Sequence, residues 1–204
     1  MSKKDTSMVK YKEEYLASQA KLGMSKVDPK DIRPPQIRLI QKSSTLGDFM
    51  DAEGNPAKVG QFFHTGRLQI LKTFEAYLLF AAKGKYTNRL KPELGILLQY
   101  TAIGAMADDL SMFGMTFRSS ALFTLSPLFT SVISQKRPMY SIKVRFETKE
   151  LTGEKGSWFI PVLRVLEAET DEVTLDILEK QALMFEQKAS DMVVPEEEGE
   201  EKTE

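Results

Sequence analysis

The most constraining feature of this sequence is a strict alternation of apolar and polar side chains near its middle. Over residues 139–151, apolar side chains at positions 140, 142, 144 and 146 alternate with polar ones at 141, 143, 145 and 147. A period of two places the two sets on opposite faces of a β-strand. A glycine-containing segment, residues 152–156, then leads into a second apolar run at 157–166. This arrangement predicts a β-hairpin, and hence an antiparallel sheet.

Other segments also favour extended structure. We expect strands in four segments that are rich in aliphatic, β-branched or aromatic residues, namely 37–42, 66–74, 75–82 and 95–103. The third should break at Lys83-Gly84-Lys85. The spacing within residues 68–79 is also compatible with a helix. Residues 46–60 predict turns, and residues 108–120 predict a loop or a bent strand.

Helical periodicity is confined to three segments. Residues 7–22 predict a short amphipathic helix, residues 119–135 a central helix, and residues 174–192 a C-terminal helix capped by Thr174. The fold class is therefore mainly β with added helices (α+β), as an OB-like curled antiparallel sheet or small barrel. We divide the chain into an N-terminal helix and proline-containing linker (1–32), an OB-like domain (33–166), a C-terminal helix (167–194) and a disordered acidic tail (195–204).

Composition excludes most common enzyme chemistry. The 204 residues include no cysteine and one histidine, His64, so thiolate zinc sites, cysteine nucleophiles and most triads are excluded. Phosphate-binding glycine motifs are missing, and Asp108-Asp109 lack the third carboxylate that a magnesium nuclease needs. We therefore expect no enzyme activity, no cofactor and no metal. The N-terminal residues lack a signal-like apolar stretch and no apolar run is long enough to cross a bilayer, so we expect a cytoplasmic protein without membrane contact.

Charge is divided unequally along the chain despite a net value of −1. Residues 33–166 hold 18 basic and 10 acidic residues, whereas residues 167–204 hold 3 basic and 14 acidic ones. Such asymmetry favours a body that meets a polyanion. The acidic tail either competes for the basic groove and recruits partners, or only keeps the chain in solution.

Basic and aromatic residues are interleaved in the body, as single-strand binding requires, because cations meet phosphates and flat rings stack on unpaired bases. One group lies in the expected turn after Ala82, a second precedes and enters the hairpin, and a third surrounds Phe117. The competing interpretation is that each aromatic residue belongs to the core, and that Trp158 caps the core. The candidate nucleic-acid-binding residues are Lys83, Lys85, Tyr86, Arg89, Lys91, Phe113, Arg118, Arg137, Tyr140, Lys143, Arg145 and Trp158.

Several short motifs resemble those of phage- and plasmid-encoded single-stranded DNA-binding proteins. These are the run from Arg33 to Gln41 (RPPQIRLIQ), Gly47-Asp48-Phe49 with Gly54, the two hairpin segments 140–148 and 153–161, and the acidic terminus. The resemblance implies an OB-type barrel that coats single strands in replication, recombination or repair, in the host cytoplasm for a phage chain, with partners reached through the tail and oligomers possible. The alternative is a structural or adaptor protein, such as a phage assembly factor, that binds no nucleic acid.

Overall fold

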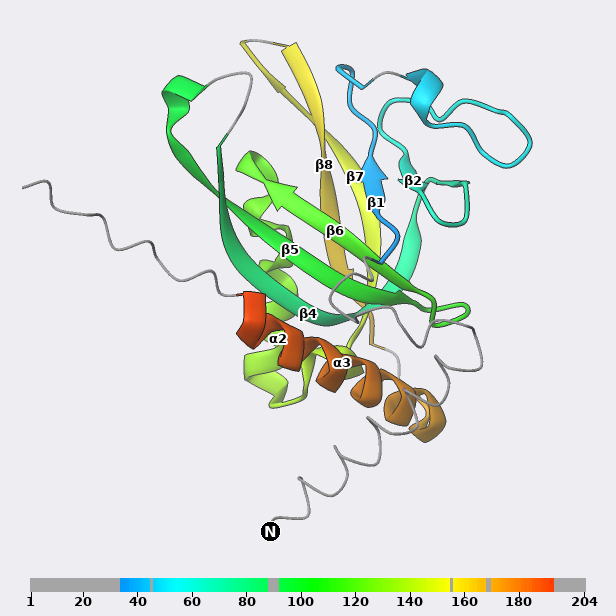
Figure 1. Ribbon diagram of the computed structural model, residues 1–204, viewed down its shortest axis with the longest axis vertical. Coiled ribbons are helices and arrows are strands. Elements are labelled where there is room, and N and C mark those ends of the chain that lie inside the picture. Colours follow the sequence, from blue (N-terminus) through cyan, green and yellow to red (C-terminus); the bar gives the residue numbers. More distant parts are fainter. Residues whose placement is uncertain (1–33, 45, 88–91, 155, 168–169, 193–204) are drawn as a thin grey trace, which may run out of the picture.

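The computed structural model describes residues 34–44, 46–87, 92–154, 156–167 and 170–192. The expected N-terminal helix, most of the linker and the acidic tail lie outside these residues, as do Arg89 and Lys91. Within them, two antiparallel sheets and two α-helices form the structure (Figure 1). The expected class, mainly β with added helices, is confirmed.

The larger sheet has five strands in the order β6-β5-β4-β7-β8. They are β4 (Phe74–Thr87), β5 (Ile96–Met106), β6 (Met112–Arg118), β7 (Lys143–Gly153) and β8 (Gly156–Val165). The expected hairpin is confirmed as β7 and β8, which pair from Val144↔Val165 to Gly153↔Gly156. Its alternation is also confirmed, since Ile142, Val144 and Phe146 are buried. Only the start differs, because Met139–Ser141 form a 3-10 helix, η5.

The expected break at Lys83-Gly84-Lys85 is wrong. Strand β4 continues through these residues and pairs with β5 as far as Thr87↔Ile96. Gly84 does not interrupt the strand because its partner Gln99 continues the ladder. The irregularity lies earlier, where Leu79 forms a β-bulge between Leu78 and Phe80. A bulge bends and twists its strand, so the long β4–β5 pair curves.

The smaller sheet has the order β1-β2-β3, with β1 (Ile37–Leu39), β2 (Phe62–His64) and β3 (Gln69–Leu71). Residues 46–60 form turns with one 3-10 helix, η2 (Leu46–Asp48), as expected. Residues 108–120 instead contain the regular strand β6. Gly114 lies within this strand. A larger residue would not fit there, because the Gln36 side chain lies where a Cβ would project.

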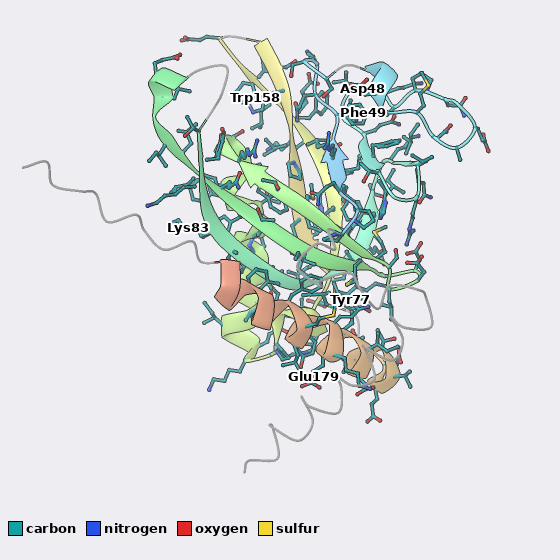
Figure 2. All side chains as sticks on the ribbon, in the orientation of Figure 1. Asp48, Phe49, Tyr77, Lys83, Trp158 and Glu179 are labelled. Carbon is teal, nitrogen blue, oxygen red and sulfur yellow. The ribbon has the colours of Figure 1, made fainter. Side chains whose placement is uncertain are left out.

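The sheet separates two apolar clusters. On one face, Phe74 stacks on Phe146 at 4.8 Å between ring centroids, and this main core also receives Phe62 of β2 and Leu128 of α2 (Ser126–Gln135). On the other face, Tyr77 and Ala105 pack with Leu178 of α3 (Glu172–Met192). Figure 2 shows Tyr77 beside α3 and Trp158 near the far end of the sheet. The remaining 3-10 helices are η3 (Pro92–Leu94) and η4 (Ser119–Leu125).

The C-terminal helix is confirmed, but its expected Thr174 cap is wrong. Helix α3 begins at Glu172, and the Asp171 carboxylate accepts the Thr174 N–H at 2.9 Å. This hydrogen bond lowers the pKa of Asp171 below its usual value. Thr174 therefore lies inside the first turn, and Asp171 supplies the acceptor that a helix start requires.

Strand β1 lies between β6 and β8, the two edge strands of the large sheet. It joins β6 through the parallel bridge Gln36↔Gly114 and reaches β8 through a side chain, that of Gln41. Within the described residues, no continuous strand ladder closes the sheet into a barrel. No described helix combines the length and apolar character needed to span a membrane.

Candidate functional site

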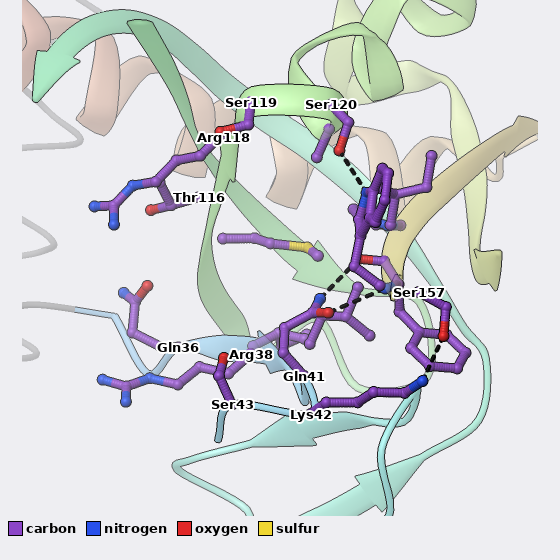
Figure 3. A pocket seen from close by; sticks show the side chains of 18 residues that line it. Gln36, Arg38, Gln41, Lys42, Ser43, Thr116, Arg118, Ser119, Ser120 and Ser157 are labelled. Atoms are coloured by element: carbon purple, nitrogen blue, oxygen red, sulfur yellow. Dashed lines mark hydrogen bonds between the residues drawn. The ribbon is translucent and has the colours of Figure 1, made fainter. Parts of the chain in front are cut away.

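A cavity of about 760 Å³ opens where β1 runs between the edges of β6 and β8 (Figure 3). We call it the seam cavity. Its walls come from β1 and the residues after it, from the end of β6 with the start of η4, and from the first half of β8. It is lined by Gln36, Ile37, Arg38, Leu39, Gln41, Lys42, Ser43, Met115, Thr116, Arg118, Ser119, Ser120, Ala121, Ser157, Trp158, Phe159, Ile160 and Pro161.

Gln41 holds the β8 side of the seam cavity. Its Nε2 donates to the main-chain oxygen of Phe159 at 2.7 Å, and its Oε1 accepts the Phe159 N–H at 3.0 Å. The amide thus satisfies both main-chain groups of Phe159, as a neighbouring strand residue does in a ladder. Lys42, the next residue, donates from Nζ to Ser157 Oγ. These contacts fix the end of β1 against β8.

The β6 side presents main-chain groups to the seam cavity. The Gly114 N–H donates to the Pro35 oxygen at 2.7 Å and therefore points away from β5. Main-chain direction alternates along a strand, so the N–H and C=O groups of Thr116 and Arg118 point to this same side. Apart from the bridge at Gly114, no strand of the described residues pairs with β6 on this side.

Among the described residues, three cations and no carboxylates line the seam cavity. Arg38 on β1 and Arg118 on β6 project to the same side of it in Figure 3. Neither arginine forms an ion pair within the described part of the chain. Lys42 is the third cation, and its Nζ lies 3.7 Å from the Glu150 carboxylate. The electrostatic character of the cavity is therefore positive, with two arginines available to an anion.

Trp158 forms one wall and is 38% exposed. Its Nε1–H donates to Ser120 Oγ at 3.0 Å. An aromatic ring that is exposed and also held in place provides a surface on which a planar group can stack. Trp158 belongs to none of the apolar clusters of the described residues.

Arg118 also links the seam cavity to Tyr86. Its guanidinium carbon lies 4.4 Å from the centre of the Tyr86 ring, and its Nε donates to Gln99 Oε1 at 2.8 Å. This cation–π contact and hydrogen bond fix the arginine at the cavity mouth. Two expected site residues, Arg118 and Tyr86, are thus brought together.

Lys83 and Lys85 do not join that pair. Lys83 is opposite Tyr100, which packs on the main core, whereas Gly84 is opposite Gln99, the partner of Arg118. Cross-strand partners share a face and successive residues alternate faces. The two lysines are exposed, but they lie on the face opposite Tyr86 and Arg118. For the described residues the expected turn is therefore a strand, and it separates the two lysines from Tyr86.

Lys143 and Arg145 are engaged by one carboxylate. Glu75 on β4 accepts from Lys143 Nζ at 2.8 Å and from Arg145 at 2.6 Å. These bonds lower the pKa of Glu75. The hydrogen bond that Lys143 donates to Glu75 also raises the pKa of Lys143. Both basic residues lie on the face of the sheet that carries Tyr77, and neither lines the seam cavity. Both already share a carboxylate partner, which makes them weaker phosphate contacts than predicted.

Arg137 and Tyr140 lie in a different depression, of about 420 Å³, beside α3. Arg137 donates to the Ser141 oxygen at 3.1 Å, and Glu172, Asp176 and Glu179 line the same depression. Carboxylates repel a phosphate, so this surface does not suit a polyanion. Arg137 and Tyr140 therefore do not extend the seam cavity.

Phe113 does not offer a face to a base. Both Phe113 and Phe117 are 0% exposed within the main core, and Phe113 packs edge-on against Phe74 at 5.7 Å. They alternate on β6 with Thr116 and Arg118, so the same strand sends rings inward and polar groups outward. For Phe113 the core alternative is correct.

Sequence reasoning missed Arg38 and Lys42 as site residues. The alternation in residues 37–42 marks both as members of the outer, basic set of a strand. What the sequence did not indicate is that this strand lies beside Arg118 and Trp158, which are 80 and 120 residues away from Arg38 in the numbering.

His64 and the acidic pair Asp108-Asp109 form hydrogen bonds and ion pairs that hold turns of the fold in place. His64 is 1% exposed, and its Nδ1 accepts the N–H groups of Gly66 and Arg67, both at 3.2 Å. Arg67 binds Asp108 at 2.9 Å and also contacts Asp109. This clamp joins the β2–β3 turn to the β5–β6 turn and lowers the pKa of Asp108.

Comparison of the chain with protein-family models, with curated proteins and with solved structures gave no significant match in any of the three.

Proposed function

We propose that this protein binds single-stranded DNA with little sequence preference, and that the seam cavity is its binding site. The observation that carries the proposal is the composition of the cavity wall, to which the described part of the chain contributes Arg38, Lys42, Arg118 and a partly exposed Trp158 but no carboxylate. Cations neutralise phosphates of any sequence, and an indole stacks on any unpaired base. A paired base in a duplex does not present its face to such a ring.

The wider role follows from this binding. The protein would protect single strands in replication, recombination or repair, and its curled antiparallel sheet with β1 in the seam supports an OB-like interpretation of the fold. The glutamate-rich residues 195–204 would compete for the cavity or recruit replication and recombination proteins. A cytoplasmic location is part of the same proposal.

The test uses the only tryptophan of the chain as a reporter. Oligo-dT added to the protein should quench Trp158 fluorescence, and a labelled oligo-dT should bind with an affinity that falls with salt. Three phosphate contacts give a log–log salt slope of about −2, at roughly −0.7 per phosphate for single strands. Duplex DNA of the same length should bind more weakly.

Variants locate the site. Arg38→Ala and Arg118→Ala should each weaken binding and reduce the salt slope by about 0.7. Lys72→Ala is the matched control, because Lys72 is exposed, carries the same charge and lies outside the cavity lining. If all three variants bind equally, the seam cavity is not the site. If the wild type does not bind at about 50 mM salt, the function is wrong.

A second candidate function, that of an adaptor, is favoured by exposed apolar side chains. Phe123 on η4 is 78% exposed and Ile133 on α2 is 76% exposed. Large apolar groups in water mark surfaces that other proteins cover. Light scattering after size exclusion, on preparations free of nucleic acid, tests this alternative. Self-association that Phe123→Ser and Ile133→Ser abolish would support it, and a monomer at all concentrations would oppose a self-assembling role.

A further inference from the structure

The position of Trp158 depends on a hydrogen bond at one end of its indole ring and on a missing side chain at the other. The first comes from the end of β6. Ser119 follows Arg118 with a φ of +51°, a left-handed conformation that non-glycine residues rarely adopt. This residue turns the chain out of the strand and into η4. Ser120, the next residue, thereby presents its Oγ to the Trp158 Nε1–H at 3.0 Å.

The second feature comes from the tip of the β7–β8 hairpin. A Cβ built on Gly153 would lie 3.2 Å from Cη2 and Cζ3 of Trp158, which is closer than ordinary carbon contacts. The missing side chain at Gly153 therefore leaves the space that the six-membered ring occupies. Gly153 pairs with Gly156, two residues before Trp158, so the same hairpin carries both the ring and its support.

We propose that Ser120 and Gly153 are positioning residues, which hold the Trp158 indole in the seam cavity so that a base can stack on it without reordering the ring. This inference rests on the proposed function. Ser120 restrains the nitrogen end of the ring and Gly153 leaves room for the opposite end, while 38% of the residue stays accessible. A side chain that is ordered before binding loses less conformational entropy when the ligand arrives.

The hydrogen bond also has a chemical role. A nucleic acid that covers the ring removes water from its surroundings, and an indole N–H without an acceptor would then be buried unsatisfied. Ser120 Oγ already satisfies that donor, so stacking does not incur this cost. Loss of the acceptor should weaken binding about fivefold, as expected for one hydrogen bond.

The experiment compares three exchanges with two matched controls. Ser120→Ala removes the acceptor, Ser120→Thr retains a hydroxyl, and Gly153→Ala displaces the ring. Ser134→Ala is the control for serine, because Ser134 is exposed on α2 and lies outside the lining of the seam cavity. Gly47→Ala is the control for glycine, since a Cβ there meets nothing within 4 Å.

Two measurements are made on each variant, after circular dichroism has shown a wild-type fold. The first is the fluorescence anisotropy of Trp158 in the free protein, which reports ring mobility. The second is the affinity for labelled oligo-dT. We expect Ser120→Ala and Gly153→Ala to lower the anisotropy and to weaken binding about fivefold. Ser120→Thr and both controls should behave as the wild type.

The outcomes separate this inference from the proposed function. If the wild type binds oligo-dT and Ser120→Ala binds equally well, the positioning role is wrong and the function stands. If Ser120→Ala weakens binding but Ser120→Thr does not restore it, the hydroxyl is not the cause and the inference fails. If the wild type does not bind, the function fails first, and the positioning role fails with it.

Discussion

Replacing Gln41 by alanine should destabilise the protein by about 2 kcal/mol. The exchange removes two hydrogen bonds, at 2.7 and 3.0 Å, each worth about 1 kcal/mol in a partly buried setting. It also leaves both main-chain groups of Phe159 without their protein partner. For a chain of this size, 2 kcal/mol corresponds to a melting temperature lower by about 4–8 °C.

Urea unfolding followed by circular dichroism measures this difference, with Gln69→Ala as the matched control. Gln69 is exposed on β3 and should change stability by less than about 0.5 kcal/mol. Gln41→Glu adds a sharper test, because one carboxylate oxygen would face the Phe159 carbonyl. The free energy of unfolding of Gln41→Glu should be closer to that of the wild type at pH 4, where the protonated acid can donate to the Phe159 carbonyl. The reasoning is refuted if Gln41→Ala is as stable as Gln69→Ala.

Three further predictions concern pH, packing and charge. Burial, followed by the Arg67 charge, lowers the pKa of His64, so its neutral form stabilises the fold fully above pH 6.5 and this stabilisation is lost as the pH falls below that value. Urea titrations at pH 7.5 and 5.5 should show the loss in the wild type but not in His64→Asn, and equal losses in both would exclude His64 as the cause. Gly104→Ala should cost about 1–3 kcal/mol in thermal or urea unfolding, because its Cβ would lie 2.7 Å from the Phe113 ring and 2.8 Å from the Tyr77 oxygen, and a stable variant would contradict this packing. Lys143→Ala should leave the salt slope of oligo-dT binding unchanged, since Lys143 is paired with Glu75, and a decrease of about 0.7 would place it at the phosphates after all.

Local patterns were sufficient to predict the hairpin and the C-terminal helix, but not every element of this fold. The β7–β8 hairpin follows from an alternation that lies within two adjacent segments, and the C-terminal helix follows from its own periodicity. The break expected at Gly84 does not occur, because the neighbouring strand forms a hydrogen-bonded ladder with these residues. The local sequence could not show this, since the partner residue lies 15 residues further along the chain. Glycine alone does not decide such a position.

The candidate site was less predictable because it depends on contacts that are distant in sequence. Lys83, Lys85 and Tyr86 are close together in the chain, yet strand alternation places the lysines and the tyrosine on opposite faces. Arg38 and Trp158 are distant in the chain, yet the seam brings both to one cavity. The sequence singled out Arg118 and Trp158, and both line the seam cavity, but the residues that surround them there follow only from the sheet topology.

The edge of β8 that does not pair with β7 affects whether copies of this chain associate through their sheets. Edge strands tend to recruit strands from other molecules, which leads to aggregates. Here both main-chain groups of Phe159 are occupied by Gln41, and the Pro161 oxygen accepts from Thr124 Oγ1 at 2.8 Å. Proline has no N–H to donate. A strand from a second molecule therefore finds two successive positions on this edge closed, which protects a concentrated solution of the protein against sheet extension at β8.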